Sequence, residues 1–167
     1  MFLAPLFLAD AMLGRLARYL RLLGYDTAYE RDITDSGLLL LALREGRILL
    51  TRDTRLAARK VLPPGRTFLA ISDDPLAQLK EVAAHFQFRL GLLPASSLLE
   101  TARCSVCNSQ LERVASNAKE SVRDLVPEHV FLSGKAFFRC AGCGRVYWEG
   151  SHIERFLKDI RRALAAG

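Results

Sequence analysis

Four cysteines in two pairs carry the most specific chemistry in this sequence. Each pair has two residues between its members, Cys104 with Cys107 and Cys140 with Cys143. Two thiolates at this spacing can bind one metal ion, and two such pairs supply the four sulfur ligands of a closed tetrahedral zinc site. Because such a site leaves no position open for a substrate, we expect a structural zinc ion here and any reaction elsewhere in the chain.

Two disulfides, or free thiols in a core, are the alternatives to a zinc site. Disulfides are rare in a reducing cytosol. The opening run MFLAPLFLAD lacks the basic leader of a signal peptide and is too short to span a bilayer. These features favour zinc, a cytoplasmic protein and no association with a membrane.

Aspartates follow three apolar segments that the sequence predicts to be buried strands, and these are Asp10, Asp53 and Asp73. The carboxyl ends of parallel strands share one edge of a sheet, and ligands bind in the crevice there. A hard cation such as Mg²⁺ or Mn²⁺ neutralises clustered carboxylates, lowers the pKa of a bound water and stabilises charge on a phosphate. Asp32 or Asp35, where a predicted helix begins, could complete the cluster. The sequence therefore predicts a metal site that hydrolyses phosphodiesters.

Helix capping is the alternative role for several of these carboxylates. Asp35, Asp53 and Asp74 each stand where a predicted helix begins, and aspartate is a good N-cap residue. A single aspartate at a strand end is more often a cap or turn residue than a metal ligand. The repetition at several strand ends favours the metal site.

Arginine supplies most of the positive charge. The net charge is +6, and 19 of the 24 cationic residues are arginine. Residues 101–167 carry a net +4, whereas residues 1–100 carry +2. The planar guanidinium suits bidentate contacts with phosphate, so the composition favours a polyanionic partner. The alternative explanation is a GC-rich genome that favours arginine codons.

Four arginines are candidates for nucleic-acid binding. Arg15, Arg18 and Arg21 are predicted to lie on one side of a helix over residues 11–23, opposite its leucines. The first turn of this helix could bind a phosphate through its amides and Arg15. Arg52 is expected to point into the crevice beside Asp53. An ordinary solvated helix face is the alternative for the first three.

The elements that must position these residues alternate between strands and helices in the first 90 residues. Strands are expected over residues 2–9, 25–29, 47–51 and 67–72, and helices over 11–23, 35–44, 54–61 and 75–86. This alternation indicates βαβ units, and hence an α/β fold with a mostly parallel sheet flanked by helices.

The pattern changes at about Leu92. A linker is expected at residues 94–97, strands at 129–139 and 144–148, and an amphipathic helix at 152–165. We therefore predict an α/β domain over residues 1–92 and a zinc ribbon with a C-terminal helix over residues 98–167. His152 lies beside Trp148 and Glu149, where a cap for the last helix is favoured over contact with nucleic acid.

Four longer stretches, in chain order, carry a family resemblance: ADAMLGRLARYLRLLGYDT, GRILLTRD, RCSVCNSQL and FFRCAGCGRVYWEGSH. Together they resemble the Mut-seven C-terminal ribonuclease family over nearly the whole chain. LGRLAR, LLTRD and CGRVYWEGSH are highly specific in combination. The resemblance implies a PIN-like nuclease fold followed by a small zinc ribbon.

The resemblance also implies residue roles. In PIN-like enzymes, acidic residues at strand ends bind Mg²⁺ or Mn²⁺ and cut RNA. Asp10 and Asp53 match the acids of the AD and LTRD motifs, and Asp35 is the best match for the acid at the helix entrance. Asp73 is a candidate for the fourth ligand, in a loop that matches no specific motif. The cysteines match the family's zinc ligands. The implied activity is a metal-dependent ribonuclease with Asp10, Asp35 and Asp53 as catalytic residues.

Two other functions remain compatible with parts of the sequence. The first is a non-catalytic RNA-binding protein, in which the ribbon and the arginines bind RNA and the carboxylates are structural. The second is a phosphoacceptor or phosphatase domain, which also places aspartates at parallel strand ends. Asp10 lacks the second aspartate of a DxD motif, which argues against that class.

Overall fold

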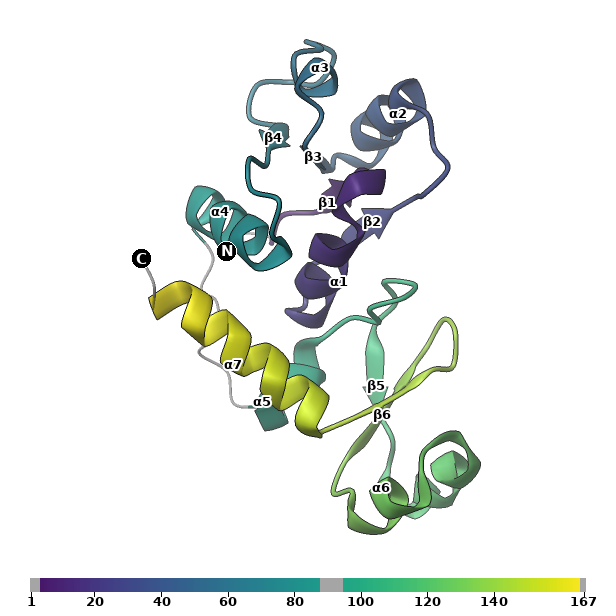
Figure 1. Ribbon diagram of the computed structural model, residues 1–167. Coiled ribbons are helices and arrows are strands. Elements are labelled where there is room, and N and C mark those ends of the chain that lie inside the picture. The colour runs from purple at the N-terminus through teal and green to yellow at the C-terminus, as the bar shows by residue number, and fades with distance from the viewer. Residues whose placement is uncertain (1–3, 88–94, 166–167) are drawn as a thin grey trace. The chain divides into compact units, whose positions relative to one another are not determined.

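The computed structural model describes residues 4–87 and 95–165 of the chain (Figure 1). The chain divides into two units, one of Met1–Arg21 with Tyr25–Arg89 and the other of Leu22–Gly24 with Leu90–Gly167. Each unit has a sheet of its own. The two are therefore described separately.

A four-stranded parallel sheet forms the centre of the first unit. Its strands lie in the order β2-β1-β3-β4 and are β1 (Phe7–Ala9), β2 (Thr27–Tyr29), β3 (Ile48–Thr51) and β4 (Thr67–Leu69). In this register Leu8 lies opposite both Ala28 and Leu49. The inner strands β1 and β3 are buried along their whole length, as expected for a parallel sheet that is covered on both faces. The predicted α/β class is confirmed.

Helices flank both faces of this sheet. They are the 3₁₀ helix η1 (Ala11–Leu13) and the α-helices α1 (Gly14–Leu22), α2 (Asp35–Glu45), α3 (Thr54–Ala57) and α4 (Pro75–Phe86). Leu8 and Leu49 form one core cluster with leucines of α2 and α3. Phe7 points to the opposite face because side chains alternate along a strand, and its ring meets Phe86 of α4 edge-on at 5.3 Å.

Local sequence explains where α2 and α4 begin and end. The side chain of Thr34 accepts a hydrogen bond from the amide of Gly37 at the start of α2, and Gly46 ends that helix with φ of 63°. Asp74 caps α4 by accepting from two backbone amides, and Pro75 occupies the first turn. Since proline has no amide to leave unpaired there, it favours a helix start. The helix predicted over residues 75–86 is confirmed.

The second unit has a three-stranded antiparallel sheet in the order β5-β6-β7. Its elements are α5 (Ala95–Thr101), β5 (Leu111–Arg113), the 3₁₀ helix η2 (Ser116–Leu125), α6 (Glu128–Ser133), β6 (Phe137–Cys140), β7 (Val146–Trp148) and α7 (Ser151–Ala165). Leu98, Leu99, Phe138 and Leu157 lie in one core cluster of this unit, so α5 and α7 pack on this sheet. None of the helices in the described part of the chain combines the length and the apolar character that a bilayer crossing demands.

One predicted strand is wrong over its first half. Residues 128–133 form α6, and only Phe137–Cys140 form a strand. Pro127 precedes the helix. Within the helix Phe131 is buried, and the next residue, Leu132, is 69% exposed. The short apolar run looks like a strand in the sequence, because periodicity cannot separate a strand from a helix over so few residues.

Other boundaries differ by a few residues. The helix predicted over 54–61 ends at Ala57, and the strand predicted over 67–72 ends at Leu69. Residues 95–97 of the expected linker form the start of α5, whereas Pro94 lies outside the described residues, as do residues 2 and 3 of the first predicted strand and the proposed boundary at residue 92.

Candidate functional site

Asp10 directly follows the last residue of β1 and is 4% exposed. One carboxylate oxygen accepts a hydrogen bond from the amide of Met12 at 2.8 Å, and Asp10 is thus the N-cap of η1. The other oxygen accepts from the Thr51 hydroxyl and from the amide of Arg52, the latter at 3.3 Å. Three protein donors therefore fix this carboxylate between the ends of two neighbouring strands.

Thr51, the last residue of β3, connects the two acidic positions. Its hydroxyl donates to Asp10 and accepts from the amide of Asp53 at 2.9 Å. It is fully buried. The ends of β1 and β3 therefore belong to one hydrogen-bonded network, which places Asp10 and Asp53 at the same edge of the sheet.

The Asp53 carboxylate caps α3. One of its oxygens accepts from the amides of Arg55 at 2.7 Å and Leu56 at 3.1 Å. Bonds from the amides of Leu56 and then Arg55 lower the pKa of this carboxyl. It is thus held as the anion. The capping alternative raised by the sequence is realised here.

Asp35 and Asp73 are each paired with an arginine. Asp35 lies in the first turn of α2 and accepts a hydrogen bond from Arg59 at 3.0 Å. Asp73 forms an ion pair with Arg52 and is largely exposed. Each acid therefore already has a positively charged partner.

No three of the four predicted metal-binding aspartates lie close enough together in this structure to hold one ion. Among the residues that the structure describes, the only group of three or more His, Cys, Asp or Glu side chains close enough to hold one ion is the set of four cysteines. The oxygen donors suit Mg²⁺ or Mn²⁺ in their chemistry. In this structure the four carboxylates accept hydrogen bonds from amides, the Thr51 hydroxyl and guanidinium groups.

Glu81 of α4 is an acidic residue that the sequence analysis missed. Its carboxylate accepts from the amides of Ile71 and Ser72, at 2.9 and 3.0 Å, and from the Ser72 hydroxyl. Burial raises the pKa of this carboxyl, but these bonds and the nearby Arg52 lower it more. Glu81 thus shapes the loop after β4. It follows no strand, so the pattern that singled out Asp10 and Asp53 could not find it.

The candidate RNA-binding arginines have different environments. Arg15 and Arg18 are exposed on α1. Arg52 is partly buried, and its Nε has no hydrogen-bond partner within the described residues. Arg21 is 4% exposed, and its Nε donates to the carbonyl of Thr27 at 2.8 Å. The prediction that Arg21 lies on the exposed side of the helix is therefore wrong. Its guanidinium is buried and links α1 to β2.

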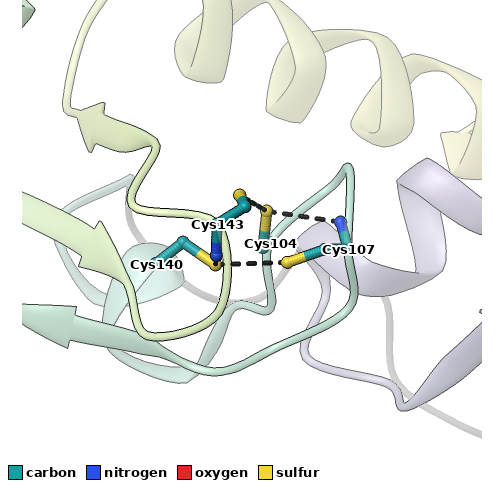
Figure 2. Close-up of side chains that lie close together, drawn as sticks. All are labelled: Cys104, Cys107, Cys140 and Cys143. Atoms are coloured by element: carbon teal, nitrogen blue, oxygen red, sulfur yellow. Dashed lines mark hydrogen bonds between the residues drawn. The ribbon is translucent and has the colours of Figure 1, made fainter.

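The four cysteines form the second centre (Figure 2), and their sulfur atoms all lie within 4.8 Å of one another. The Sγ atoms of Cys104 and Cys143 are 3.6 Å apart, and those of Cys107 and Cys140 are 3.3 Å apart. Ligands that are each about 2.3 Å from one zinc ion lie about 3.8 Å apart in a tetrahedron. The four thiols could therefore hold a zinc ion between the turn before β5 and the turn after β6.

Hydrogen bonds and burial give these thiols different acidities. A bond with the Ser109 hydroxyl lowers the pKa of Cys107 to about 6, and burial raises the pKa of Cys140 to about 12. The Tyr147 hydroxyl lies 3.1 Å from the Cys104 sulfur and accepts from the amide of Ser105 at 3.1 Å. Tyr147 therefore holds the first cysteine turn on the sheet from β7.

The chain was compared with known families, curated proteins and solved structures. The model of the Mut7-C RNAse domain matches residues 5–160. The chain belongs to this family. The comparison with curated proteins and the comparison with solved structures each find no match. The matched residues 5–160 include both the network around Asp10 and the four cysteines.

Proposed function

We propose that this Mut7-C chain is a ribonuclease that hydrolyses RNA phosphodiester bonds at the carboxyl edge of the parallel sheet. The family match over residues 5–160 carries this proposal. Asp10 supports the location, because a carboxylate that is buried at a strand end and held by three donors is a preorganised group. The second unit, which holds the four cysteines, is proposed to aid RNA binding.

We further propose that cleavage depends on Mg²⁺ or Mn²⁺ held by Asp10 and Asp53 together with Asp35 and Asp73. When bound, such an ion lowers the pKa of a water molecule and stabilises charge on the phosphate. Arg52 and Arg59 now neutralise Asp73 and Asp35, so the ion would compete with both arginines. Released from Asp73, Arg52 could bind a phosphate oxygen of the RNA.

The exposed arginines of α1 are the proposed backbone contacts in the first unit. Arg15 and Arg18 lie on the helix that follows η1, which Asp10 caps. Guanidinium groups bind phosphate in bidentate fashion and without regard to sequence. We therefore propose that α1 positions the RNA strand beside the Asp10 network.

The test is cleavage of end-labelled RNA and DNA strands by the purified chain, with Mg²⁺, with Mn²⁺ and without a divalent cation. We expect metal-dependent cleavage that Asp53→Asn reduces by orders of magnitude. Asparagine caps a helix about as well as aspartate, so α3 should survive this change. Asp74→Asn is the matched control, because Asp74 caps α4 by accepting from two amides in the same way.

A non-catalytic RNA-binding protein is the competing function, and the caps and arginine pairs made by Asp35, Asp53 and Asp73 favour it. It predicts RNA binding with no cleavage under any metal condition. Cleavage that persists unchanged in Asp53→Asn would instead remove Asp53 from the proposed metal site.

A further inference from the structure

A cavity of about 570 Å³ lies in the second unit, among α6, the end of β7 and the start of α7. It is lined by residues from 127 to 154, and none of the four cysteines is among them. Its volume is in the range of pockets that bind small organic groups, about 300–1,000 Å³. The Asp10 network and the zinc site leave this cavity without a role.

Trp148 gives the cavity an aromatic wall. This last residue of β7 is partly buried and packs against a cluster of Val122, Val126, Phe131 and Phe137. The cluster holds the ring in place, so little side-chain freedom would be lost on binding. Gly150 lies close beside it, and a Cβ atom there would be 3.2 Å from the indole Nε1. A larger residue at position 150 would crowd this edge of the ring.

The polar lining combines carboxylates and imidazole rings with one lysine. Glu149 and Glu154 contribute carboxylates, Lys135 contributes an ammonium group, and His129 and His152 contribute imidazole rings. All five side chains are exposed. Two carboxylates outnumber the one lysine in the lining, which disfavours a phosphate inside the cavity. The same carboxylates are good acceptors for the amino groups of nucleobases.

We propose that this cavity binds an unpaired nucleobase of single-stranded RNA, which stacks on Trp148 and donates a hydrogen bond from its exocyclic amino group to the carboxylate of Glu149 or Glu154. This assignment rests on the proposed ribonuclease function and adds a base-binding subsite in the second unit. Single-stranded RNA is recognised by stacking of splayed bases on aromatic rings and by hydrogen bonds to base edges. Lys135 contacts the adjoining phosphate.

Carboxylate acceptors make the site selective. Cytosine presents an amino group where uracil presents a carbonyl oxygen, and a carbonyl would face the carboxylates without a donor. Both bases are pyrimidines of similar stacking area. Oligo(C) should therefore bind more tightly than oligo(U), on the order of tenfold, the value of one charge-assisted hydrogen bond.

Trp148 is the only tryptophan of the chain, so its emission reports directly on the cavity. The experiment titrates the full chain with 12-nucleotide RNA strands of C or of U and records tryptophan fluorescence. No divalent cation is added, and gels check that the strands stay intact. We expect oligo(C) to quench the emission, with the weaker binding of oligo(U) seen as a shifted midpoint.

Variants test each part of the proposal by an independent binding measurement, such as anisotropy of labelled RNA. Trp148→Ala should weaken oligo(C) binding by about 5- to 150-fold, the range for loss of one base–aromatic stack. Trp148→Phe keeps a ring against the cluster and serves if the alanine variant does not fold.

The carboxylates and the lysine are tested separately. The double variant Glu149→Gln with Glu154→Gln should erase the preference for C over U, whereas Glu112→Gln on β5 should preserve it. Lys135→Ala should weaken binding more than its charge-matched control Lys60→Ala.

The outcomes separate this inference from the proposed function. If wild-type protein cleaves RNA but its fluorescence does not respond to oligo(C), the cavity is not a base site and the ribonuclease proposal stands. Equal binding of C and U strands overturns the amino-group contact. A response to an arginine-rich peptide but not to RNA overturns the inference in favour of a protein partner. If no RNA is cleaved although oligo(C) quenches Trp148 as expected, the ribonuclease proposal fails and the base site is supported.

Discussion

Asp10 is the side chain on which the candidate site depends most. We expect Asp10→Asn to lower the free energy of unfolding by about 1–3 kcal/mol, because an amide group would face donors that now have a buried acceptor. The measurement is thermal unfolding without added Mg²⁺ or Mn²⁺. Asp74→Asn, an exposed cap in the same unit, should leave the melting temperature nearly unchanged. An Asp10→Asn protein as stable as wild type would show that the donors find other partners.

Glu81 should make the stability of the first unit depend on pH. The pKa of its carboxyl is lowered below the ordinary value of 4.5 in the folded chain. The ionised Glu81 carboxylate therefore stabilises the folded chain above about pH 4.5. This stabilisation is lost as the pH falls through the lowered pKa of Glu81 in the folded chain. Glu81→Gln should therefore reduce the drop in melting temperature between about pH 6 and pH 3. Glu112→Gln, which changes an exposed residue of β5, should retain the wild-type drop.

The acidic positions show how far residue types alone can predict a site. Their placement at strand ends identified the edge of the sheet, because strand ends share an edge in any parallel sheet. The partner of each carboxylate was not predictable. Whether Asp53 faces a cation or the amides of α3 depends on a side-chain rotation, and spacing in the sequence carries no information about it.

Helix α1 has one exposed face and one buried face. Successive residues turn by about 100°, so a spacing of three drifts by about 60° each time. Arg21 therefore lies about 120° around the helix from Arg15 and only about 40° from Ala17, which is buried. Spacing in the sequence groups the three arginines together, and the drift explains why the third is buried.

Substitutions on the exposed and the buried face of α1 should have different effects, one on RNA binding and the other on stability. Replacing Arg15 and Arg18 with alanine should make RNA affinity less dependent on salt. The slope of log affinity against log salt concentration should fall by about 0.7 for each lost phosphate contact. Arg21→Ala should instead lower the melting temperature, because it removes a buried donor to the Thr27 carbonyl. Binding titrations at several salt concentrations, beside thermal unfolding, check both. An unchanged slope in the double variant would assign the exposed face to solvent.

Whole elements were predictable where several local signals agreed. For α4, Asp74, Pro75 and the apolar periodicity all indicate the same helix, and its bounds are those predicted. For α6 the signals conflict, since Val130, Phe131 and Leu132 favour a strand while Pro127 and Glu128 favour a helix start. Packing of Phe131 in the cluster with Phe137 and Val122 decides the outcome, and this contact is not visible in the sequence.

For the molecule as a whole, zinc should stabilise one unit and not the other. We expect one zinc per chain, and we expect Cys140→Ser to lose it and to unfold the second unit, since binding energy at such a site is folding energy. The first unit has its own core around Leu8 and Leu49 and should keep its sheet. Elemental analysis and hydrogen exchange of each unit measure this. Freshly purified protein without zinc would contradict the expectation.

The Asp10 carboxylate also links two loops that are far apart in the sequence. The amides of Met12 and Arg52 both donate to it, one in the segment after β1 and the other in the segment after β3. If the carboxylate turns away from this position, both amides lose their acceptor at once. The exchange of these two amides with deuterium should therefore rise and fall together, while the amide of Leu50 inside β3 stays protected. Their correlated exchange would report how often the carboxylate turns away from both donors.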